Sequence, residues 1–265
     1  MKKSVIALVM IIAGILLVGA GYIMVGANLE GFNSESVRTS EKSYVCKGKV
    51  TDIVIKETSG IVMVRKGNTD TVEISYFDSE KEPRYDIAEN GGRLSVIRKD
   101  KINFMFFNLD LKDDAMTVTV PADYTGPLDI GNTSGRIALD GVTGQKITMN
   151  NTSGKIELTN VKSETDLSVS NTSGSITLTQ TEAGGNISAS TTSGSIKPDG
   201  LKAGGDISLS TVSGSIKGTI DGAESDYRIN AHAVSGSNNL QNSDKGEKKL
   251  DVKTTSGSIG IEFLK

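Results

Sequence analysis

Four oxygen-bearing side chains recur at a fixed interval in the second half of the chain. Asp166, Asn186, Asp206 and Asp226 are successive members of the series, and their numbers differ by 20. Carboxylate and amide oxygens are ligands for Ca²⁺, and clustered carboxylates cleave glycosidic bonds. The same residue types also cap turns, and repeats stacked about 4.8 Å apart would present them singly. We therefore expect turn caps here, with no metal ligands and no catalytic carboxylates.

Nucleophilic catalysis has even less support. The chain has one histidine, His232, and one cysteine, Cys46. A triad built on either residue needs a base and an orienting group nearby, and a single cysteine excludes an internal disulfide and a cysteine-based metal site. We expect His232 on the surface and Cys46 as a buried or unreactive thiol. The sequence thus predicts no enzyme, no catalytic residue, no cofactor and no metal; the alternative is a polysaccharide lyase or hydrolase built on a β-helix.

A repeated Thr-Ser-Gly turn determines which elements would position any such group. Its glycine recurs at intervals of 19, 20, 20, 20, 22 and 21 residues. A fixed period of this length is the mark of a solenoid, in which each coil contacts only its neighbours. The glycines of the repeat are Gly135, Gly154, Gly174, Gly194, Gly214, Gly236 and Gly257.

Apolar and polar residues alternate on both sides of each turn, as at residues 187–189 and 195–197. Alternation with a period of two predicts strands with one buried face, so each coil should hold two strands and a short third one. We expect a positive φ at the turn glycine and corner side chains that hydrogen-bond the equivalent residue of the next coil. Parallel crossovers are nearly always right-handed, which predicts a right-handed solenoid. The third apolar position is Val142, Val161, Leu201 and Ile220, with Thr181 as the exception.

The composition fits a turn-rich β protein. The chain has 265 residues, 30 glycines, 4 prolines and no tryptophan, and its formal net charge is −3. Glycine is a poor helix former, and nucleic-acid binding requires a strongly basic surface. The composition therefore favours an all-β fold and excludes nucleic acid as a partner.

The N-terminal segment is predicted to hold the protein at a membrane. Residues 4–29 carry no charge and would span about 39 Å as a helix, enough to cross a bilayer with some tilt. The two lysines before them place residues 1–3 in the cytoplasm and the rest of the chain outside. The alternative is a signal peptide cleaved after residues 25–27, Val-Gly-Ala. Residues 30–49 are polar and without periodicity, and we interpret them as a tether.

Residues 50–127 contain strand-like runs without the strict repeat. We interpret them as a β cap or irregular opening coils, because the first edge of a solenoid needs cover. Residues 58–60, Thr-Ser-Gly, resemble a first copy of the turn, and residues 90–92, Asn-Gly-Gly, predict a hairpin. The aromatic cluster at residues 104–107 is either a plug on the open end of the core or an exposed loop. The expected strands lie at residues 53–55, 61–64, 72–76, 94–96 and 116–120.

Residues 128–265 are predicted to form about seven regular coils. The coil of Gly236 departs from the pattern, because Asn238 replaces the usual isoleucine, and residues 244–249 look like a charged loop between coils. The outward serine and threonine rows suit a flat ligand surface such as a glycan. Outward Glu157, Lys197 and Lys217 interrupt those rows, which argues against ice binding. Glycosylation sequons begin at Asn132, Asn151, Asn171 and Asn186, and turn chemistry explains all four.

The serial Thr-Ser-Gly-x-Ile-x-Leu units, the TVTVP run at residues 117–121 and the early turn at residues 58–60 resemble a known family. It is the bacterial "putative adhesin" domain family of unknown function, and the resemblance covers about residues 50–263. It implies a β-solenoid on the cell surface, linked to adhesion or to the envelope-stress response, and it implies no catalytic residues. We therefore expect a membrane-anchored binding or scaffold protein whose partner is an envelope protein or a surface glycan. A passive structural spacer is the other alternative.

Overall fold

The computed structural model describes residues 39–79, 83–99 and 115–264. These residues belong to one compact unit that begins at Thr39. The predicted anchor at residues 4–29 and the aromatic cluster at residues 104–107 lie outside the described residues. Within the described ranges, none of the helices has the length and apolar character needed to cross a membrane.

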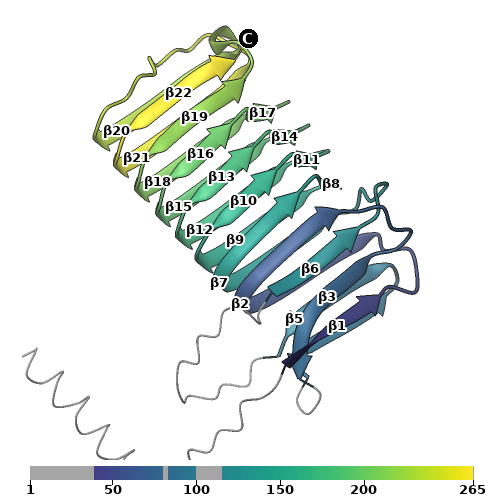
Figure 1. Ribbon diagram of the computed structural model, residues 1–265. Helices are drawn as coiled ribbons and strands as arrows, with labels where there is room; N and C mark the ends of the chain where they lie inside the picture. The colour runs from purple at the N-terminus through teal and green to yellow at the C-terminus, as the bar shows by residue number, and fades with distance from the viewer. Residues whose placement is uncertain (1–38, 80–82, 100–114, 265) are drawn as a thin grey trace, which may run out of the picture. The chain divides into compact units, whose positions relative to one another are not determined.

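The repeat folds as a stack of parallel β coils (Figure 1). A regular coil has a long first strand, a corner at the turn glycine and a second strand, whereas the coil of β20, which lies wholly within the described residues, has no second strand. Two strands, β2 (Asp52–Lys66) and β7 (Leu128–Asp140), run through the corner without a break. The first strands of the following coils are β9 (Ile147–Ser153), β12 (Leu167–Ser173), β15 (Ile187–Ser193), β18 (Ile207–Ser213), β20 (Tyr227–Ser235) and β21 (Lys248–Ser256). The second strands are β10 (Ile156–Thr159), β13 (Ile176–Thr179), β16 (Ile196–Asp199), β19 (Ile216–Asp221) and β22 (Ile259–Leu264).

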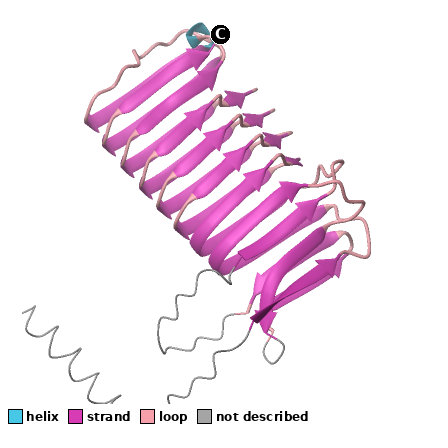
Figure 2. Cartoon of the chain, in the orientation of Figure 1, coloured by secondary structure: helices cyan, strands magenta, loops and turns pink. Residues whose placement is uncertain are grey.

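A third side of the stack is formed by two-residue strands that pair in a small parallel sheet (Figure 2). This confirms the short third strand that the sequence predicted. The third apolar position is fully buried, and Thr181 is buried there as well, with its hydroxyl donating to the carbonyl of Thr179 at 3.2 Å. The four strands are β8 (Thr143–Gly144), β11 (Lys162–Ser163), β14 (Glu182–Ala183) and β17 (Lys202–Ala203).

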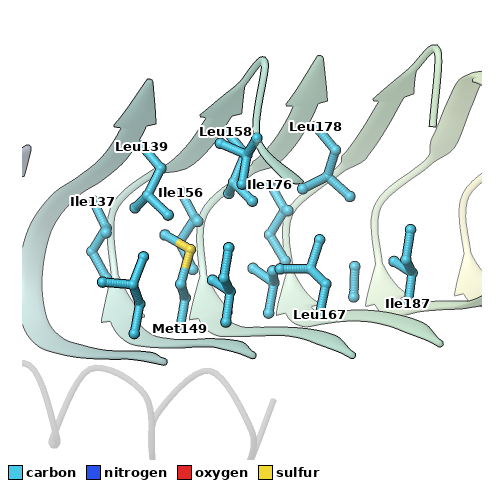
Figure 3. Packing of buried hydrophobic residues seen from close by; sticks show 14 of the residues in the cluster. Ile137, Leu139, Met149, Ile156, Leu158, Leu167, Ile176, Leu178 and Ile187 are labelled. Carbon is cyan, nitrogen blue, oxygen red and sulfur yellow. The ribbon is translucent and has the colours of Figure 1, made fainter. Parts of the chain in front are cut away.

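The core is a column of aliphatic side chains that repeats from coil to coil (Figure 3). The strands pair without slippage, so that Ile156 is the partner of Ile176 and Leu158 is the partner of Leu178. All four side chains have 0% exposure. Burial of one such side chain contributes about 1.5–3 kcal/mol. No coil could bury these residues alone, which is why the period of the sequence specifies the stack.

The glycines of the corner stack directly on one another. Gly154 and Gly174 have φ angles of +112° and +132°, as expected from the sequence. A Cβ atom placed on Gly174 would overlap the carbonyl oxygen of Gly154. Glycine is therefore required twice, by the backbone conformation and by the close approach of the next coil.

The corner side chains form a ladder that differs in one respect from the expectation. Asn171 and Thr191 do not bond the equivalent residue of the adjacent coil; they donate to the carbonyl oxygens of Gly154 and Gly174 at 2.8 and 3.1 Å. The corner turns these carbonyls away from the sheet, so a side chain must satisfy them. The expected bond between equivalent residues occurs instead one position after the glycine, where Ser195 Oγ accepts from the N–H of Ser215 at 3.3 Å.

The coils do not follow one another in sequence order at the C-terminal end. The strand β21 pairs with β18 on one side and with β20 on the other, so the last coil of the chain lies inside the stack (Figure 1). The sequence repeat alone predicts coils stacked in sequence order to the end, and the structure departs from that order here. The coil of Gly236 is outermost because its asparagines end the sheets: Asn239 Oδ1 accepts from the N–H of Ile261 at 3.0 Å. The short helix η3 (Glu224–Asp226) precedes β20.

Five strands cover the opposite edge, that of β2. The strands β5 and β6 pair with the first and second halves of β2 in parallel, and β3, β4 and β1 add antiparallel strands. The hairpin at Asn90 and the early turn at Gly60 are confirmed, and Gly60 is the direct partner of Gly135. The bounds are β1 (Thr39–Val45), β3 (Glu73–Ser79), β4 (Tyr85–Asn90), β5 (Arg93–Arg98) and β6 (Ala115–Val120).

One of these strands lies inside the segment interpreted as a tether. Residues 39–45 form β1, which pairs with β3. Its residues are mostly polar and its one aliphatic residue, Val45, is exposed, so an alternation of apolar residues could not reveal it. Its position is fixed at one end by Tyr44, whose hydroxyl donates to the Glu89 carboxylate at 2.7 Å.

Candidate functional site

The column of acidic and amide side chains is a backbone-capping ladder. Asp166 Oδ1 accepts from the N–H of Asn186, and Asn186 Oδ1 accepts from the N–H of Asp206, both at 2.8 Å. Asp206 Oδ1 continues the ladder by accepting from the N–H of Lys249, also at 2.8 Å. Each of these oxygens satisfies a backbone donor of the next coil. Across the ranges 39–79, 83–99 and 115–264, no group of three or more His, Cys, Asp or Glu side chains could hold a metal ion.

Asp226 does not belong to this column, although its spacing placed it there. It ends η3 and accepts from the N–H of Ala223 at 3.2 Å through its own side chain. The inserted last coil puts Lys249 where Asp226 was expected. The interval of 20 also fails in this coil, because its turn glycine follows the preceding one by 22 residues, and Arg228 is the residue that pairs with Lys249.

The two residues considered for nucleophilic chemistry are His232 and Cys46, and they lie on different parts of the fold. His232 is on the outward side of β20, opposite Lys253. Cys46 is a free thiol with 3% exposure, and burial raises its pKa to about 11. A thiol that stays protonated at neutral pH is a poor nucleophile.

A buried ion pair holds the cap to the first corner. Glu57 occupies the corner position that Asn132 occupies in the next coil, and its side chain is 1% exposed. Its carboxylate accepts from Arg98 Nη1 at 2.8 Å and from the hydroxyl of Tyr85 at 2.7 Å. It also accepts from the backbone N–H groups of Thr58 and Ser59. These bonds fix the end of β5 against the corner of β2.

A shallow groove of about 540 Å³ begins at this junction and crosses the outer side of the first strands. Its lining comes from β5, β2, β7, β9 and β12, so it runs from coil to coil across the strands. We call it the hairpin groove. Its principal outward side chains are Lys56, Ile97, Thr133, Asn150, Thr152 and Thr172.

The outer face that continues from the groove carries hydroxyl groups in regular rows. Ser168 is the partner of Ser188, which is the partner of Ser208. The row two residues further along holds serine at residues 170, 190 and 210. The second strands present charges instead, such as Lys197 and Asp199. The two outer faces therefore differ, and only the first is uncharged over three successive coils.

Three of the four sequon asparagines named above are buried in the folded protein. Asn132, Asn151 and Asn171 are 4–5% exposed, and each side-chain amide donates to a glycine carbonyl. Asn186 is exposed, but its oxygen belongs to the capping ladder. Turn chemistry accounts for these residues, as the sequence indicated.

Sequence reasoning noticed the outward hydroxyl rows but missed the groove. The groove depends on the register Ile97–Lys56–Gly131, which joins the non-repeating cap to the regular coils. No periodicity extends across that join. The one available signal was Gly131, which interrupts an outward row without occupying a turn.

These features define the class of protein, a parallel β-solenoid whose first edge is covered by additional strands. The carboxylates and the amide of its column accept hydrogen bonds from the backbone of the next coil. Within that class, the chain belongs to the Toastrack family, DUF4097, whose model matches residues 50–263. Among curated proteins, no sequence matches the chain.

Several solved structures are similar over most of their length. A "putative adhesin" from Bacteroides fragilis has 15% identity and a TM-score of 0.46, covering 86% of this chain and 98% of that one. A "putative cell adhesion protein" from Clostridium sporogenes has 10% identity and a TM-score of 0.43, covering 86% and 100%. A "putative lipid binding protein" from Parabacteroides distasonis has 12% identity and a TM-score of 0.38, covering 85% and 97%. Similarities this distant carry no weight for function.

Proposed function

We propose that this protein is a non-enzymatic binding or scaffold protein of the bacterial envelope, adhesin-like in the sense that its outer surface engages a partner. The observation that carries the proposal is the uncharged hydroxyl face of the first strands, which runs into the hairpin groove. The partner is an envelope protein or a cell-wall or surface glycan.

A cleavage reaction receives no support from the carboxylates. Asp166 and Asp206, the best candidates for a glycoside-cleaving pair, each cap the backbone of the next coil, and Asn186 lies between them. Both general-acid and nucleophilic mechanisms need carboxylates that converge on one bond. Turnover on a panel of glycans that disappears in the D166N/D206N variant would overturn this part of the proposal.

The proposal places the protein at the cell membrane, crossing it once, with the solenoid outside. It is supported by the uncharged residues 4–29 and the two lysines before them. Protease treatment of intact protoplasts is expected to digest the solenoid, while a tag at residue 1 is digested only after lysis. Protection of the solenoid in intact protoplasts would refute this orientation.

The direct test is capture of partners by the full chain in mild detergent, from purified wall polymers and from a membrane-protein extract. A variant that places a charge on the hydroxyl face, S188R, is expected to lose the partner. The matched variant T179R carries the same charge on the second strands and should retain it. A chain that captures nothing from either source would remove the proposed function.

We also propose that the protein acts in the envelope-stress response of the cell. A deletion strain is expected to grow normally without stress and to be sensitized by agents that damage the wall. Equal growth of the deletion and parent strains under such stress would favour the passive spacer instead.

A further inference from the structure

The hairpin groove has the form of a track that crosses strands. Ile97, Lys56, Gly131, Asn150 and Ser170 are successive partners on β5, β2, β7, β9 and β12. With strands about 4.8 Å apart, these five positions extend over about 19 Å. Gly131 has no side chain, and a Cβ atom there would meet the Lys56 side chain at 3.2 Å. A ligand in this track would therefore be elongated and would lie along the axis of the stack.

The charges at the groove are matched. The Lys56 ammonium lies 3.0 Å from the carboxylate of Asp129, and the Arg98 guanidinium lies 2.8 Å from that of Glu57. Neither pair leaves an excess of one sign to attract an ionic polymer. The remaining outward groups are hydroxyls and an amide, which both donate and accept hydrogen bonds. The groove thus suits a ligand that is itself uncharged and rich in hydroxyl groups.

The groove also offers one apolar contact. Ile97 is 43% exposed at the cap end of the track, although it is a large aliphatic residue. A sugar ring has an apolar C–H face as well as hydroxyl groups at its edge. An exposed isoleucine next to a hydroxyl row provides complementary surfaces for both.

A polypeptide is the less suitable occupant of this surface. Extended peptides bind sheets by pairing with a free edge, where backbone groups are unsatisfied. The strands β7, β9 and β12 are each paired on both sides, so they offer no edge. Only side chains are available, and beyond the groove they continue as serine at residues 190 and 210. Such a surface recognises a chain with repeated hydroxyl groups.

We propose that the hairpin groove and the adjoining hydroxyl face bind a linear, neutral glycan laid across successive coils. This inference rests on the proposed binding function and names its site and ligand class. The hydroxyls of Thr152 and Thr172 bond the sugar hydroxyls, and Ile97 contacts the C–H face of the terminal ring.

Calorimetric titration of the full chain in mild detergent with neutral β-1,4-linked oligosaccharides (chito- and cello-oligosaccharides) tests the proposal. Affinity is expected to rise with oligomer length and to be unchanged by added salt, because no net charge takes part. The T152V/T172V variant keeps the shape of both side chains and removes two hydroxyls, so it should weaken binding by about tenfold or more. The matched variant T177V removes a hydroxyl from the second strands and should bind normally.

Three results would overturn the proposal. The first is binding only to an anionic polymer such as poly(glycerol phosphate), with an affinity that falls as salt rises. The second is binding of a neutral oligosaccharide with equal affinity by T152V/T172V and the unaltered chain. The third is the absence of binding to every neutral oligosaccharide. If the full chain still captures an envelope partner in these cases, the proposed function stands and the groove assignment alone fails. If it captures none, both fail.

Discussion

The backbone N–H of Lys249 donates to the carboxylate of Asp206 at 2.8 Å, although the two residues are 43 positions apart. In the preceding coils the same bond joins residues 20 positions apart. The coil that ends the sequence is therefore not the coil that ends the stack. It is held on both sides, between β18 and β20.

Cysteine pairs can test this order. Ser210 is the partner of Lys253, and Lys253 separates it from His232. Adjacent strands lie about 4.8 Å apart, within reach of a disulfide, whereas alternate strands lie at about twice that distance. In a C46A background, S210C/K253C should form a disulfide on mild oxidation and S210C/H232C should not. Mass spectrometry reads the linkage, and crosslinking of the second pair alone would mean that the coils stack in sequence order.

The glycine column predicts a large effect of a side chain at the corner. Gly174 has a φ of +132°, and a Cβ atom would overlap the Gly154 carbonyl oxygen. Strain at such a φ costs about 1–3 kcal/mol, and displacement of the stacked backbone adds to it. Gly174→Val should lower the free energy of unfolding by more than about 3 kcal/mol in a urea titration. Gly48→Ala, where a Cβ atom meets nothing within 4 Å, should leave it unchanged. Equal midpoints for the two variants would contradict the stacked corner.

The corner ladder predicts which replacements are tolerated. Asn171 is 4% exposed and donates to the carbonyl of Gly154. Asn171→Ala should cost about 1–3 kcal/mol, because a buried acceptor loses its donor. Asn171→Thr should recover most of that loss, since Thr191 and Thr211 do the same in the following coils. Thermal melts of the three proteins compare these outcomes, and a threonine variant as unstable as the alanine variant would rule out the hydroxyl as a substitute donor.

Much of this architecture could be read from the period of the sequence. The partners Ile156 and Ile176, and the strain-tolerant glycines between the strands, follow directly from a repeat of about twenty residues. The early turn at Gly60 was recognisable for the same reason, because Thr-Ser precedes both Gly60 and its partner Gly135. A sequence repeat indicates which residues occupy equivalent positions in successive coils, and these equivalences determine the register of strand pairing.

Equivalence does not determine order, and this is where the sequence was insufficient. Ser213 pairs with Ser256 in the structure, but from the sequence it could equally pair with Ser235, since each of these two serines directly precedes a turn glycine. The choice depends on Asn239, which replaces a strand at the edge of β22 and so suits only the outermost coil. The groove was hidden for a related reason, because Ile97 and Lys56 become neighbours across a join between irregular and regular segments.

The buried pair of Glu57 and Arg98 should contribute far more than an exposed one. Their side chains are 1% and 13% exposed, and they join the cap to the first coil. Removing one member of a buried pair costs about 3–5 kcal/mol. Glu57→Ala should fall in that range by urea unfolding, and a double-mutant cycle with Arg98→Ala should show strong coupling. Lys56→Ala removes an exposed ion pair and should change stability by less than about 1 kcal/mol. Additive effects of the two changes at Glu57 and Arg98 would refute the coupling.

The contact between β1 and the hairpin should weaken in acid. The hydroxyl of Tyr44 and the backbone N–H groups of Lys47 and Gly48 bond the Glu89 carboxylate and lower its pKa. Because the folded pKa lies below the unfolded value of about 4.3, the stabilisation is fully present above that value. It is lost as the pH falls through the folded pKa. Urea titrations at several pH values should show a stability difference between the unaltered protein and Glu89→Gln that is constant near neutrality and shrinks below about pH 4. Tyr44→Phe removes the largest cause of the lowered Glu89 pKa and should make the stability difference depend less on pH. If the stability difference between the unaltered protein and Glu89→Gln is the same at every pH, the ionised carboxylate does not hold β1 in place.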